Sequence, residues 1–237
     1  MTSYHGGKQR IGKEFAQVIY NVSKDSKMNI KGYCEPFCGM LGVYQHIPNL
    51  LGKDLEYIAN DLNKSTISMW EDCSKGWIPP TCTTEEEYNN LKISEPSAIK
   101  GYIGHQYSFG GQFFNGYAPK YGKNIESTRA SNNVKRISNI LQDVNFMCGS
   151  YEKLSYLKNY IIYCDPPYNN TICKYKEKFD NDKFILWCRQ MRKYNIVIIS
   201  EYSKPSDTTC IFTKDIKLTG RLGHGGNCNR NEKIFLF

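Results

Sequence analysis

The four residues Asp165-Pro166-Pro167-Tyr168 carry the clearest chemical signal in this sequence. They follow the apolar run Tyr160–Cys164, which predicts a buried strand. The two prolines remove two backbone N–H donors, so the carbonyls beside them can accept hydrogen bonds without a competing donor nearby. The Asp165 carboxylate is a further acceptor, and the Tyr168 ring offers a face on which a base can stack. The segment therefore predicts a site that holds a planar amino group for alkylation.

A strand-ending turn would also explain this segment, because prolines end strands and Asp favours turns. Two other strand-ending loops decide between the interpretations. Glycines in Glu35–Gly42 follow a predicted strand and let the backbone approach a ligand closely, although their spacing is not that of the dinucleotide fingerprint. Asp61 follows the next predicted strand, where an acid commonly accepts hydrogen bonds from ribose, although it could equally cap the following helix. A nucleoside site beside an alkylation site predicts S-adenosylmethionine as the methyl donor.

The N-terminal segment Tyr4-His5-Gly6-Gly7-Lys8 allows two interpretations. It could be a frayed terminus with a flexible Gly-Gly lead. It could also fold back over the cofactor and bring Lys8 near the cofactor carboxylate or a phosphate.

Strands and helices alternate along most of the chain. The predicted strands are residues 30–34, 55–59, 144–148, 160–164 and 195–200. The predicted helices are residues 8–22, 41–50, 62–70, 132–141, 151–157 and 182–193. This alternation predicts an α/β fold with a mostly parallel sheet covered on both faces, and ligands bind such sheets at the carboxyl ends of the strands. Two last strands, 209–213 and 233–237, should form an edge hairpin.

The alternation breaks in residues 76–130, which are rich in Pro, Gly, Thr, Asn and Tyr and contain one predicted helix near 85–91. We interpret them as a subdomain inserted into a domain made of residues 1–75 and 131–237. Charge is uneven around it: the net charge is +8, yet residues 54–95 hold nine acids and three bases, whereas residues 100–136 hold six bases and one acid. Aromatic residues are interleaved with these bases, which favours nucleic acid over a solvated loop. The candidate phosphate or base contacts are Lys100, Lys120, Lys123 and Arg129.

Composition excludes several other classes of protein. No apolar run in the 237 residues approaches the roughly 18 needed to span a bilayer, and the first residues lack the apolar core of a signal peptide. The ten cysteines include no C-x-x-C pair, and none of the four histidines pairs with a cysteine at zinc spacing. We therefore expect an intracellular, soluble, monomeric protein with reduced thiols, of which Cys34, Cys164 and Cys188 are buried, and no metal.

In this order, the motifs closely resemble those of the Dam-like DNA adenine-N6 methyltransferases, and viral and phage members in particular. That family has an aromatic-x-Gly-Gly-Lys segment, a Glu-Pro-Phe-x-Gly loop, an Asp after the second strand, a target-recognition insert and then Asp-Pro-Pro-Tyr. The corresponding segments here are Tyr4–Lys8, Glu35–Gly39, Asp61, residues 76–130 and Asp165–Tyr168, and residues 108–117 and 229–235 also look like family segments. Tyr4 stands where many relatives have Trp, and Gly39-Met40-Leu41-Gly42 has one more residue between its glycines than the common Gly-x-Gly.

The resemblance implies a Rossmann-like class I methyltransferase sheet, double-stranded DNA as partner and transfer to adenine N6. It implies that five residues contact the cofactor or shape its pocket: Tyr4, Lys8, Phe37, Asp61 and Asp165. It further implies that Asp165 and the Pro166 carbonyl orient the target amine and that Tyr168 stacks on a flipped adenine. Two alternatives stay open: an RNA-base methyltransferase, because Asp-Pro-Pro-Tyr occurs in some of those, and a catalytically silent nucleic-acid-binding relative. A cytosine-N4 enzyme is disfavoured, because those usually carry Ser in place of Asp165.

Overall fold

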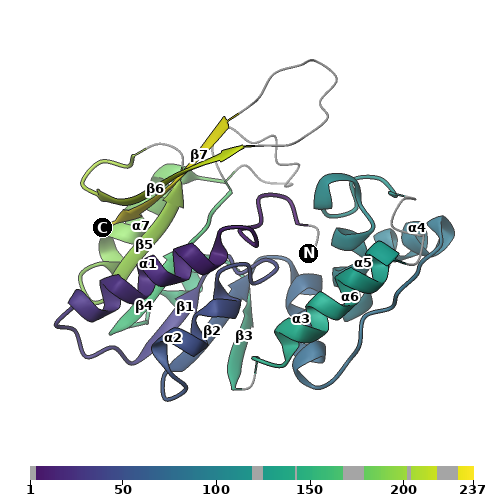
Figure 1. Cartoon of the computed structure of the whole chain (residues 1–237), viewed down its shortest axis with the longest axis horizontal. Coiled ribbons are helices and arrows are strands. Elements are labelled where there is room, and N and C mark those ends of the chain that lie inside the picture. Colours follow the sequence, from purple (N-terminus) through teal and green to yellow (C-terminus); the bar gives the residue numbers. More distant parts are fainter. Residues whose placement is uncertain (1–3, 119–124, 142, 168–178, 202–203, 218–228) are drawn as a thin grey trace.

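The computed structural model describes residues 4–118, 125–141, 143–167, 179–201, 204–217 and 229–237, and Figure 1 shows their arrangement. A twisted sheet with helices packed against it forms one part of the molecule. Helices α4 (Glu85–Ile93), α5 (Ala98–Gln106) and α6 (Ile125–Ser138) gather at the other end. No helix in these ranges combines the length and the apolar character that crossing a membrane requires.

Seven strands form one sheet in the order β3-β2-β1-β4-β5-β7-β6. The strands from β1 to β5 pair in parallel, whereas β7 lies antiparallel between β5 and β6. The chain winds from β1 toward β3 on one side and from β4 toward β5 on the other, so the strand order reverses between β1 and β4. Such a reversal opens a crevice at the carboxyl ends of the strands. The strand bounds are Gly32–Glu35 (β1), Glu56–Asp61 (β2), Val144–Cys148 (β3), Tyr160–Cys164 (β4), Ile196–Glu201 (β5), Thr209–Lys217 (β6) and Asn229–Leu236 (β7).

The two faces of the sheet carry separate apolar clusters, because successive side chains of a strand point to opposite faces. On β4, Ile161 and Tyr163 join the cluster that contains α1 (Gly12–Asp25), α3 (Lys64–Ser74) and α6, whereas Ile162 and Cys164 join the cluster under α7 (Asn181–Met191). Burial on both faces explains the unbroken apolar run of β4. Cys34, Cys164 and Cys188 are buried free thiols, as predicted. The predicted α/β fold with a mostly parallel, Rossmann-like sheet is confirmed, and so is the predicted antiparallel pairing of the last two strands.

Two predicted helices are wrong. The helix predicted over residues 41–50 is replaced by a 3-10 turn, η1 (Tyr44–His46), and the four-residue helix α2 (Pro48–Leu51). Pro48 lacks an N–H donor and can stand only in the first turn of a helix, so the helix has to restart there. The helix predicted over residues 151–157 is a single 3-10 turn, η4 (Tyr151–Leu154).

Helix α5 was not predicted, and α6 begins inside the segment assigned to the insert. Glycines lower helix propensity, which hides α5 in the sequence. The structure gives the reason for one of them: a Cβ on Gly101 would lie 2.1 Å from the carbonyl oxygen of Ser65, so only glycine allows α5 to pack this closely on α3. The predicted helix near 85–91 is confirmed as α4, which begins with a capping box between Thr84 and Glu87. The division at residues 76 and 130 stays a prediction.

Candidate functional site at the carboxyl ends of the strands

The predicted site residues Asp61 and Asp165 lie at the carboxyl ends of parallel strands that flank the reversal of strand order. Asp61 is the last residue of β2, and Asp165 directly follows β4. Between these two strands lies β1, which ends at Glu35. The chemistry-bearing loops predicted from the sequence therefore meet on one rim of the sheet.

The Asp165 carboxylate receives two donors on one oxygen. Lys8 Nζ lies 2.8 Å from Asp165 Oδ1, and Ser200 Oγ donates to the same oxygen at 2.8 Å. Lys8 comes from the N-terminal segment and Ser200 from β5, so segments far apart in sequence converge on this carboxylate. Pro166 is buried behind it, and Tyr168 lies outside the described residues.

The N-terminal segment folds back over the site. The Lys8 side chain is 4% exposed, and its ammonium also donates to the Gly6 carbonyl at 3.2 Å and lies 3.8 Å from Glu232 Oε2. Glu232 stands on β7 and is itself buried. Of the two interpretations of this segment, the structure favours the one in which it folds back, rather than the frayed terminus. The contact of Lys8 in the structure is with the Asp165 carboxylate.

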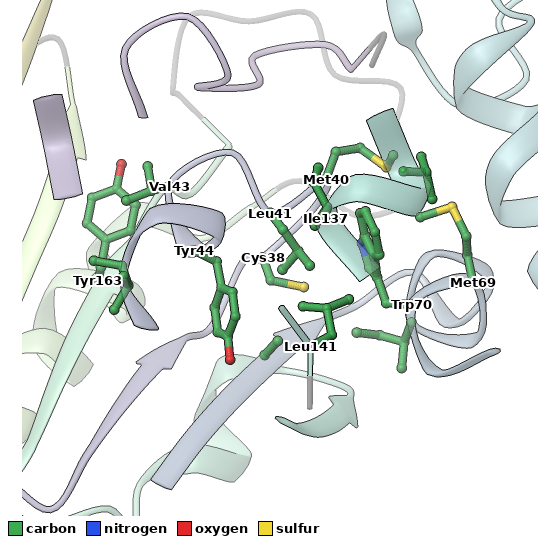
Figure 2. Packing of buried hydrophobic residues seen from close by; sticks show 14 of the residues in the cluster. Cys38, Met40, Leu41, Val43, Tyr44, Met69, Trp70, Ile137, Leu141 and Tyr163 are labelled. Atoms are coloured by element: carbon green, nitrogen blue, oxygen red, sulfur yellow. The ribbon is translucent and has the colours of Figure 1, made fainter. Parts of the chain in front are cut away.

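The glycine loop after β1 is held in a strained conformation by the core beneath it. Leu41 has a positive φ of 53°, which costs a branched residue about 1–3 kcal/mol, and its side chain is fully buried. Figure 2 shows Cys38 and Leu41 near Trp70 below the loop, and Trp70 Nε1 donates to the Gly39 carbonyl at 2.9 Å. The extra residue between the two glycines is thus accommodated by turning Met40 and Leu41 into the core.

Gly39 is the point at which the loop meets the N-terminal segment. It has a positive φ of 45°, and a Cβ there would lie 2.7 Å from the Tyr4 ring. Tyr4 in turn lies 4.8 Å from the His105 ring, between centroids. Tyr4 therefore forms an aromatic cover over the loop, which only glycine permits at residue 39.

Asp61 fixes the same loop from the neighbouring strand. Its Oδ2 accepts a hydrogen bond from the Gly39 backbone N–H at 2.9 Å, and its Oδ1 accepts from the Asn63 N–H at 2.9 Å. Burial raises the pKa of Asp61, whereas these backbone donors lower it. The alternative that Asp61 caps the next helix is wrong, because Asn63 is the N-cap residue of α3 and accepts from Ser65 and Thr66.

Phe37 lies on the other side of the loop. Its ring packs against Tyr151, Phe179 and Phe184 at centroid distances of 5.7, 5.9 and 5.5 Å. Phe37 therefore packs against the cluster under α7, on the other face of the sheet from Trp70.

Sequence reasoning assigned no role to Glu35 at the end of β1. Its side chain is buried and accepts a hydrogen bond from the Tyr33 hydroxyl at 2.7 Å. Burial raises the pKa of Glu35 to about 8, and the nearby Asp165 adds to this effect. Glu35 is therefore a mostly neutral carboxyl group at pH 7.

His105 on α5 connects the insert to the site and was also missed. Its Nδ1 lies 3.2 Å from the Gly111 carbonyl oxygen, and its Nε2 lies 3.1 Å from Thr66 Oγ1. A carbonyl can only accept, so Nδ1 carries the proton and Nε2 accepts from the threonine. Burial lowers the pKa of His105 to about 4, so the ring is neutral at pH 7. The His5 N–H also donates to the Gly111 carbonyl, at 3.3 Å.

Two of the four candidate nucleic-acid contacts, Lys100 and Arg129, lie on helices α5 and α6. Lys100 Nζ lies 6.0 Å from the centroid of the Phe114 ring. It also donates hydrogen bonds to the carbonyls of Lys92 and Ser94 at the C-terminal end of α4. Arg129 is exposed on α6. Lys120 and Lys123 fall outside the described residues. The role of these four residues in DNA binding stays a prediction.

Two signals could have found residues that sequence reasoning missed. Glu232 lies in the terminal segment that resembled family members, but no role was given to it. Ser200 ends a predicted strand next to the one that leads to Asp165, which is a place where ligand-binding residues gather. Within the described ranges, no three His, Cys, Asp or Glu side chains gather so that they could hold a metal ion.

The residues at the crevice fit the nucleoside part of S-adenosylmethionine. Gly39 lets an aromatic face, that of Tyr4, lie against the loop, and Asp61 brings a carboxylate to the end of β2. An aromatic face suits the adenine ring, and a carboxylate suits the ribose hydroxyls.

Comparison with solved structures finds several methyltransferases. The rRNA methyltransferase aviRa from Streptomyces viridochromogenes is 11% identical, with 94% of this chain and 83% of that chain covered and a TM-score of 0.41. A protein from Pyrococcus horikoshii described as an RNA methyltransferase is 11% identical, with 96% and 83% covered and a TM-score of 0.42. A methyltransferase complexed with SAH is 8% identical, with 98% and 54% covered and a TM-score of 0.36.

No curated protein matches the chain. The model of the D12 class N6 adenine-specific DNA methyltransferase family, in contrast, matches residues 4–97 and 97–219. The two matched stretches include the N-terminal segment, the glycine loop, Asp61, α5 and Asp165. The chain therefore belongs to the D12 class of N6 adenine-specific DNA methyltransferases and is an S-adenosylmethionine-dependent methyltransferase.

Proposed function

We propose that this protein transfers a methyl group from S-adenosylmethionine to N6 of adenine in duplex DNA. The observation that carries the proposal is the Asp165 carboxylate, which lies at the strand-order reversal and is held there by Lys8 and Ser200. Family membership supports adenine N6 as the acceptor. The basic, aromatic composition of residues 100–136 supports nucleic acid as the substrate.

Asp165 and the Pro166 carbonyl act on the target amine in this proposal. Bound S-adenosylmethionine supplies an electrophilic methyl group on a sulfonium. Asp165 and the carbonyl accept hydrogen bonds from the two N6 hydrogens, which directs the nitrogen lone pair toward the methyl group. As the bond from N6 to the methyl carbon forms and the carbon–sulfur bond breaks, positive charge develops on N6, and the carboxylate offsets it. S-adenosylhomocysteine leaves, and N6 then loses one proton to solvent to give neutral N6-methyladenine. The chemistry needs no covalent enzyme intermediate, so no cysteine is required as a nucleophile.

The remaining predicted residues bind the two substrates. Tyr4, Phe37 and Asp61 hold the cofactor or shape its pocket. The target base must leave the duplex, at a cost of a few kcal/mol, and stacking on Tyr168 offsets part of that cost. Lys100, Lys120, Lys123 and Arg129 contact phosphates or bases.

The test is transfer of labelled methyl from S-adenosylmethionine to mixed-sequence duplex DNA, with RNA of matched sequence in parallel, followed by nucleoside analysis. We expect label in N6-methyladenine from DNA. Label in RNA alone would replace the proposal with an RNA-base methyltransferase. Binding of cofactor and DNA without transfer to either substrate would favour a silent relative.

Two substitutions at Tyr168 test the stacking step. Tyr168→Ala should reduce transfer because the flipped base loses its stacking partner, which is worth about 1–3 kcal/mol per base. Tyr168→Phe should retain transfer, because the ring remains. An equal loss in both variants would show that the hydroxyl matters and that stacking alone is the wrong role.

A further inference from the structure

We propose that Lys8 and Glu232 are positioning residues for the methyl transfer, which together fix the orientation of the Asp165 carboxylate. This inference rests on the proposed function, because it assigns Asp165 the role of acceptor for the target amine. It gives Lys8 a different role from the cofactor contact that the family resemblance implies. It gives Glu232 its first role.

Lys8 is held too firmly at Asp165 to be a mobile cofactor ligand. Its ammonium lies 2.8 Å from Asp165 Oδ1, 3.2 Å from the Gly6 carbonyl oxygen and 3.8 Å from Glu232 Oε2, and its side chain is 4% exposed. A buried ammonium needs paired charge and hydrogen-bond partners, because leaving water is costly. Lys8 has both at this position, and both come from the protein.

A second arm reaches the same carboxylate oxygen through the sheet. The Tyr163 hydroxyl donates to Ser200 Oγ at 3.1 Å, and Ser200 Oγ donates to Asp165 Oδ1 at 2.8 Å. Both residues are buried, on β4 and β5. Lys8 and Ser200 therefore donate to one oxygen from two separate segments, and this fixes how the carboxylate is turned. A fixed acceptor is what transfer to a weakly nucleophilic amine requires.

Glu232 completes the network from β7. This strand lies antiparallel beside β5 and so brings a residue near the C-terminus next to one near the N-terminus. At 3.8 Å its carboxylate attracts the Lys8 ammonium without a short hydrogen bond, so Lys8 stays closer to Asp165. Glu232 thereby holds the Lys8 ammonium between two carboxylates.

Among the residues that the structure describes, the groups near Asp165 that can carry charge include Lys8 from the N-terminal segment, Glu232 from β7, Glu35 from β1 and Tyr163 from β4. Burial raises the pKa values of Glu35 and Tyr163, so both are largely uncharged at pH 7. The Lys8 ammonium is the charged group that contacts the Asp165 carboxylate at 2.8 Å. Removing it should leave this carboxylate freer to turn, whereas removing the charge of Glu232 should weaken the hold on Lys8.

The test uses Lys8→Met and Glu232→Gln in the full chain, with Lys13→Met as the matched control, because Lys13 is an exposed lysine on α1. For Lys8→Met we expect kcat to fall about 100-fold while the Kd for S-adenosylmethionine changes less than about threefold. For Glu232→Gln we expect a smaller fall in kcat, about tenfold, again with little change in the Kd, because Lys8 loses one of the two acids that hold it. Lys13→Met should behave as wild type.

A loss of kcat with the Kd for S-adenosylmethionine preserved is the decisive result, because general damage to the fold would weaken cofactor binding as well. A lower affinity of Lys8→Met for S-adenosylmethionine, with kcat unchanged at saturation, would overturn the proposal and make Lys8 a cofactor ligand. Thermal unfolding checks each variant. If Lys8→Met does not fold, Lys8→Arg keeps the charge and should retain more than about a tenth of wild-type kcat, and Glu232→Gln still separates the effect on kcat from the effect on the Kd.

A measurement without substrate separates this proposal from the proposed function. The carboxyl 13C resonance of Asp165, assigned by its loss in Asp165→Asn, should change its chemical shift at constant pH in Lys8→Met and in Glu232→Gln and should stay in place in Lys13→Met. An unmoved resonance in Lys8→Met and Glu232→Gln, with active wild-type enzyme, would overturn the network alone. Moved resonances with wild-type enzyme that methylates neither DNA nor RNA would overturn the proposed function and leave the network standing.

Discussion

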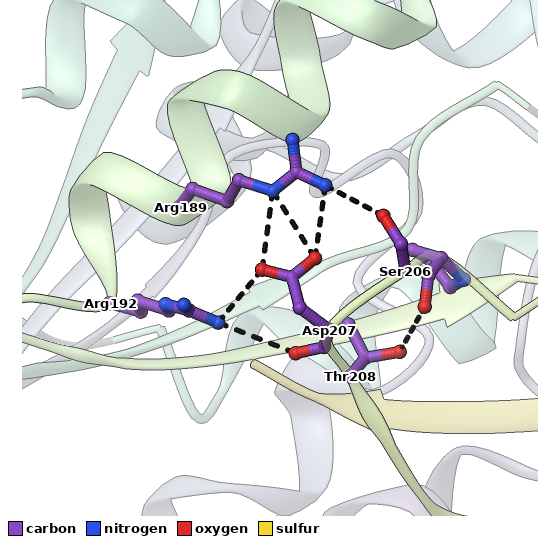
Figure 3. Close-up of polar contacts among 6 residues, drawn as sticks. Arg189, Arg192, Ser206, Asp207 and Thr208 are labelled. Atoms are coloured by element: carbon purple, nitrogen blue, oxygen red, sulfur yellow. Dashed lines mark hydrogen bonds and ion pairs between the residues drawn. The ribbon is translucent and has the colours of Figure 1, made fainter.

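Asp165 and Asp207 each bind basic side chains, but in contrasting surroundings. Asp165 meets Lys8 at 2.8 Å in a pair whose side chains are 19% and 4% exposed. Asp207 meets Arg189 at 3.0 Å and Arg192 at 3.1 Å, with all three side chains 36–39% exposed. Figure 3 shows this second group, in which Arg189 also donates to Ser206. The exposed carboxylate pairs with two arginines, whereas the less exposed one pairs with a buried lysine at the strand-order reversal.

The difference shows that burial determines what an ion pair contributes. Water and salt screen the exposed group, so such pairs add little to stability even with good geometry. The pKa of Asp207 is lowered mainly by its hydrogen bonds from Arg189. A buried pair is seldom kept for stability, because well-packed apolar residues often do as well, yet removing one partner costs about 3–5 kcal/mol. This makes function the better explanation for Asp165 and Lys8.

The largest expected effect is a loss of activity, and it appears when the same substitution is made at each of the two acids and the results are compared. Asp165→Ala should lower kcat by about 10³-fold or more, because the amine loses its charged acceptor. Asp207→Ala should leave kcat near that of wild type. Steady-state transfer of labelled methyl to DNA measures both, and binding of S-adenosylmethionine verifies that the first variant still has its cofactor pocket. Near wild-type turnover of Asp165→Ala would contradict the proposed mechanism.

Glu35→Gln sharpens the contrast in the alkaline range. The pKa of Glu35 in the fold is about 8, above its ordinary value of 4.5. The stability that goes with the retained proton is fully present below about pH 4.5 and is lost as the pH rises through about 8. Gln cannot ionise and still accepts a hydrogen bond from the Tyr33 hydroxyl. Between pH 5 and pH 8 the free energy of unfolding should therefore fall by about 3 kcal/mol less in the variant than in wild type. Urea unfolding at the two pH values measures this difference.

His105→Gln tests the acid side. The folded pKa of His105, about 4, is lower than its ordinary value of 6.5, so between these values the unfolded chain binds the proton and the folded chain does not. Stability should therefore fall as the pH drops from about 6.5 to about 4, by about 2 kcal/mol between pH 7 and pH 5. Gln offers a donor and an acceptor but no titration, so this part of the acid sensitivity should vanish. An unchanged pH dependence in the variant would mean that His105 has the same pKa in the folded and the unfolded chain.

The smallest expected effect is on the stability of Asp207→Asn. The pKa of Asp207 is lowered in the fold, so its contribution is present above the ordinary value of 3.8 and is lost as the pH falls through the lower folded value. At pH 7 we expect a small decrease in melting temperature at low salt that disappears at high salt. A large, salt-independent decrease would show that exposure does not govern the strength of this pair.

Local sequence was sufficient wherever an element is defined by its own apolar pattern. Strands β3 and β4 have the predicted bounds, because residues 144–148 and 160–164 are short apolar runs between polar turns. Helix α5 was missed because Gly101 is present for the sake of its contact with Ser65 on α3, which no local pattern reveals. The predicted helix over residues 41–50 was wrong because Pro48 interrupts the hydrogen-bond ladder despite the apolar spacing.

The sequence by itself determined the fold class, the order of the motifs and the family, because these depend on periodicity and on residue types along the chain. Only the tertiary structure decided which residues act together. The group at Asp165 draws on both ends and the later part of the chain. Lys8 and Ser200 each lie within 4 Å of Asp165, and Glu232 lies within 4 Å of Lys8. The parallel strands, with β7 inserted antiparallel beside β5, bring these residues together. Their charges matter because the fold removes them from water, and burial is a property of the packed molecule that no stretch of sequence possesses.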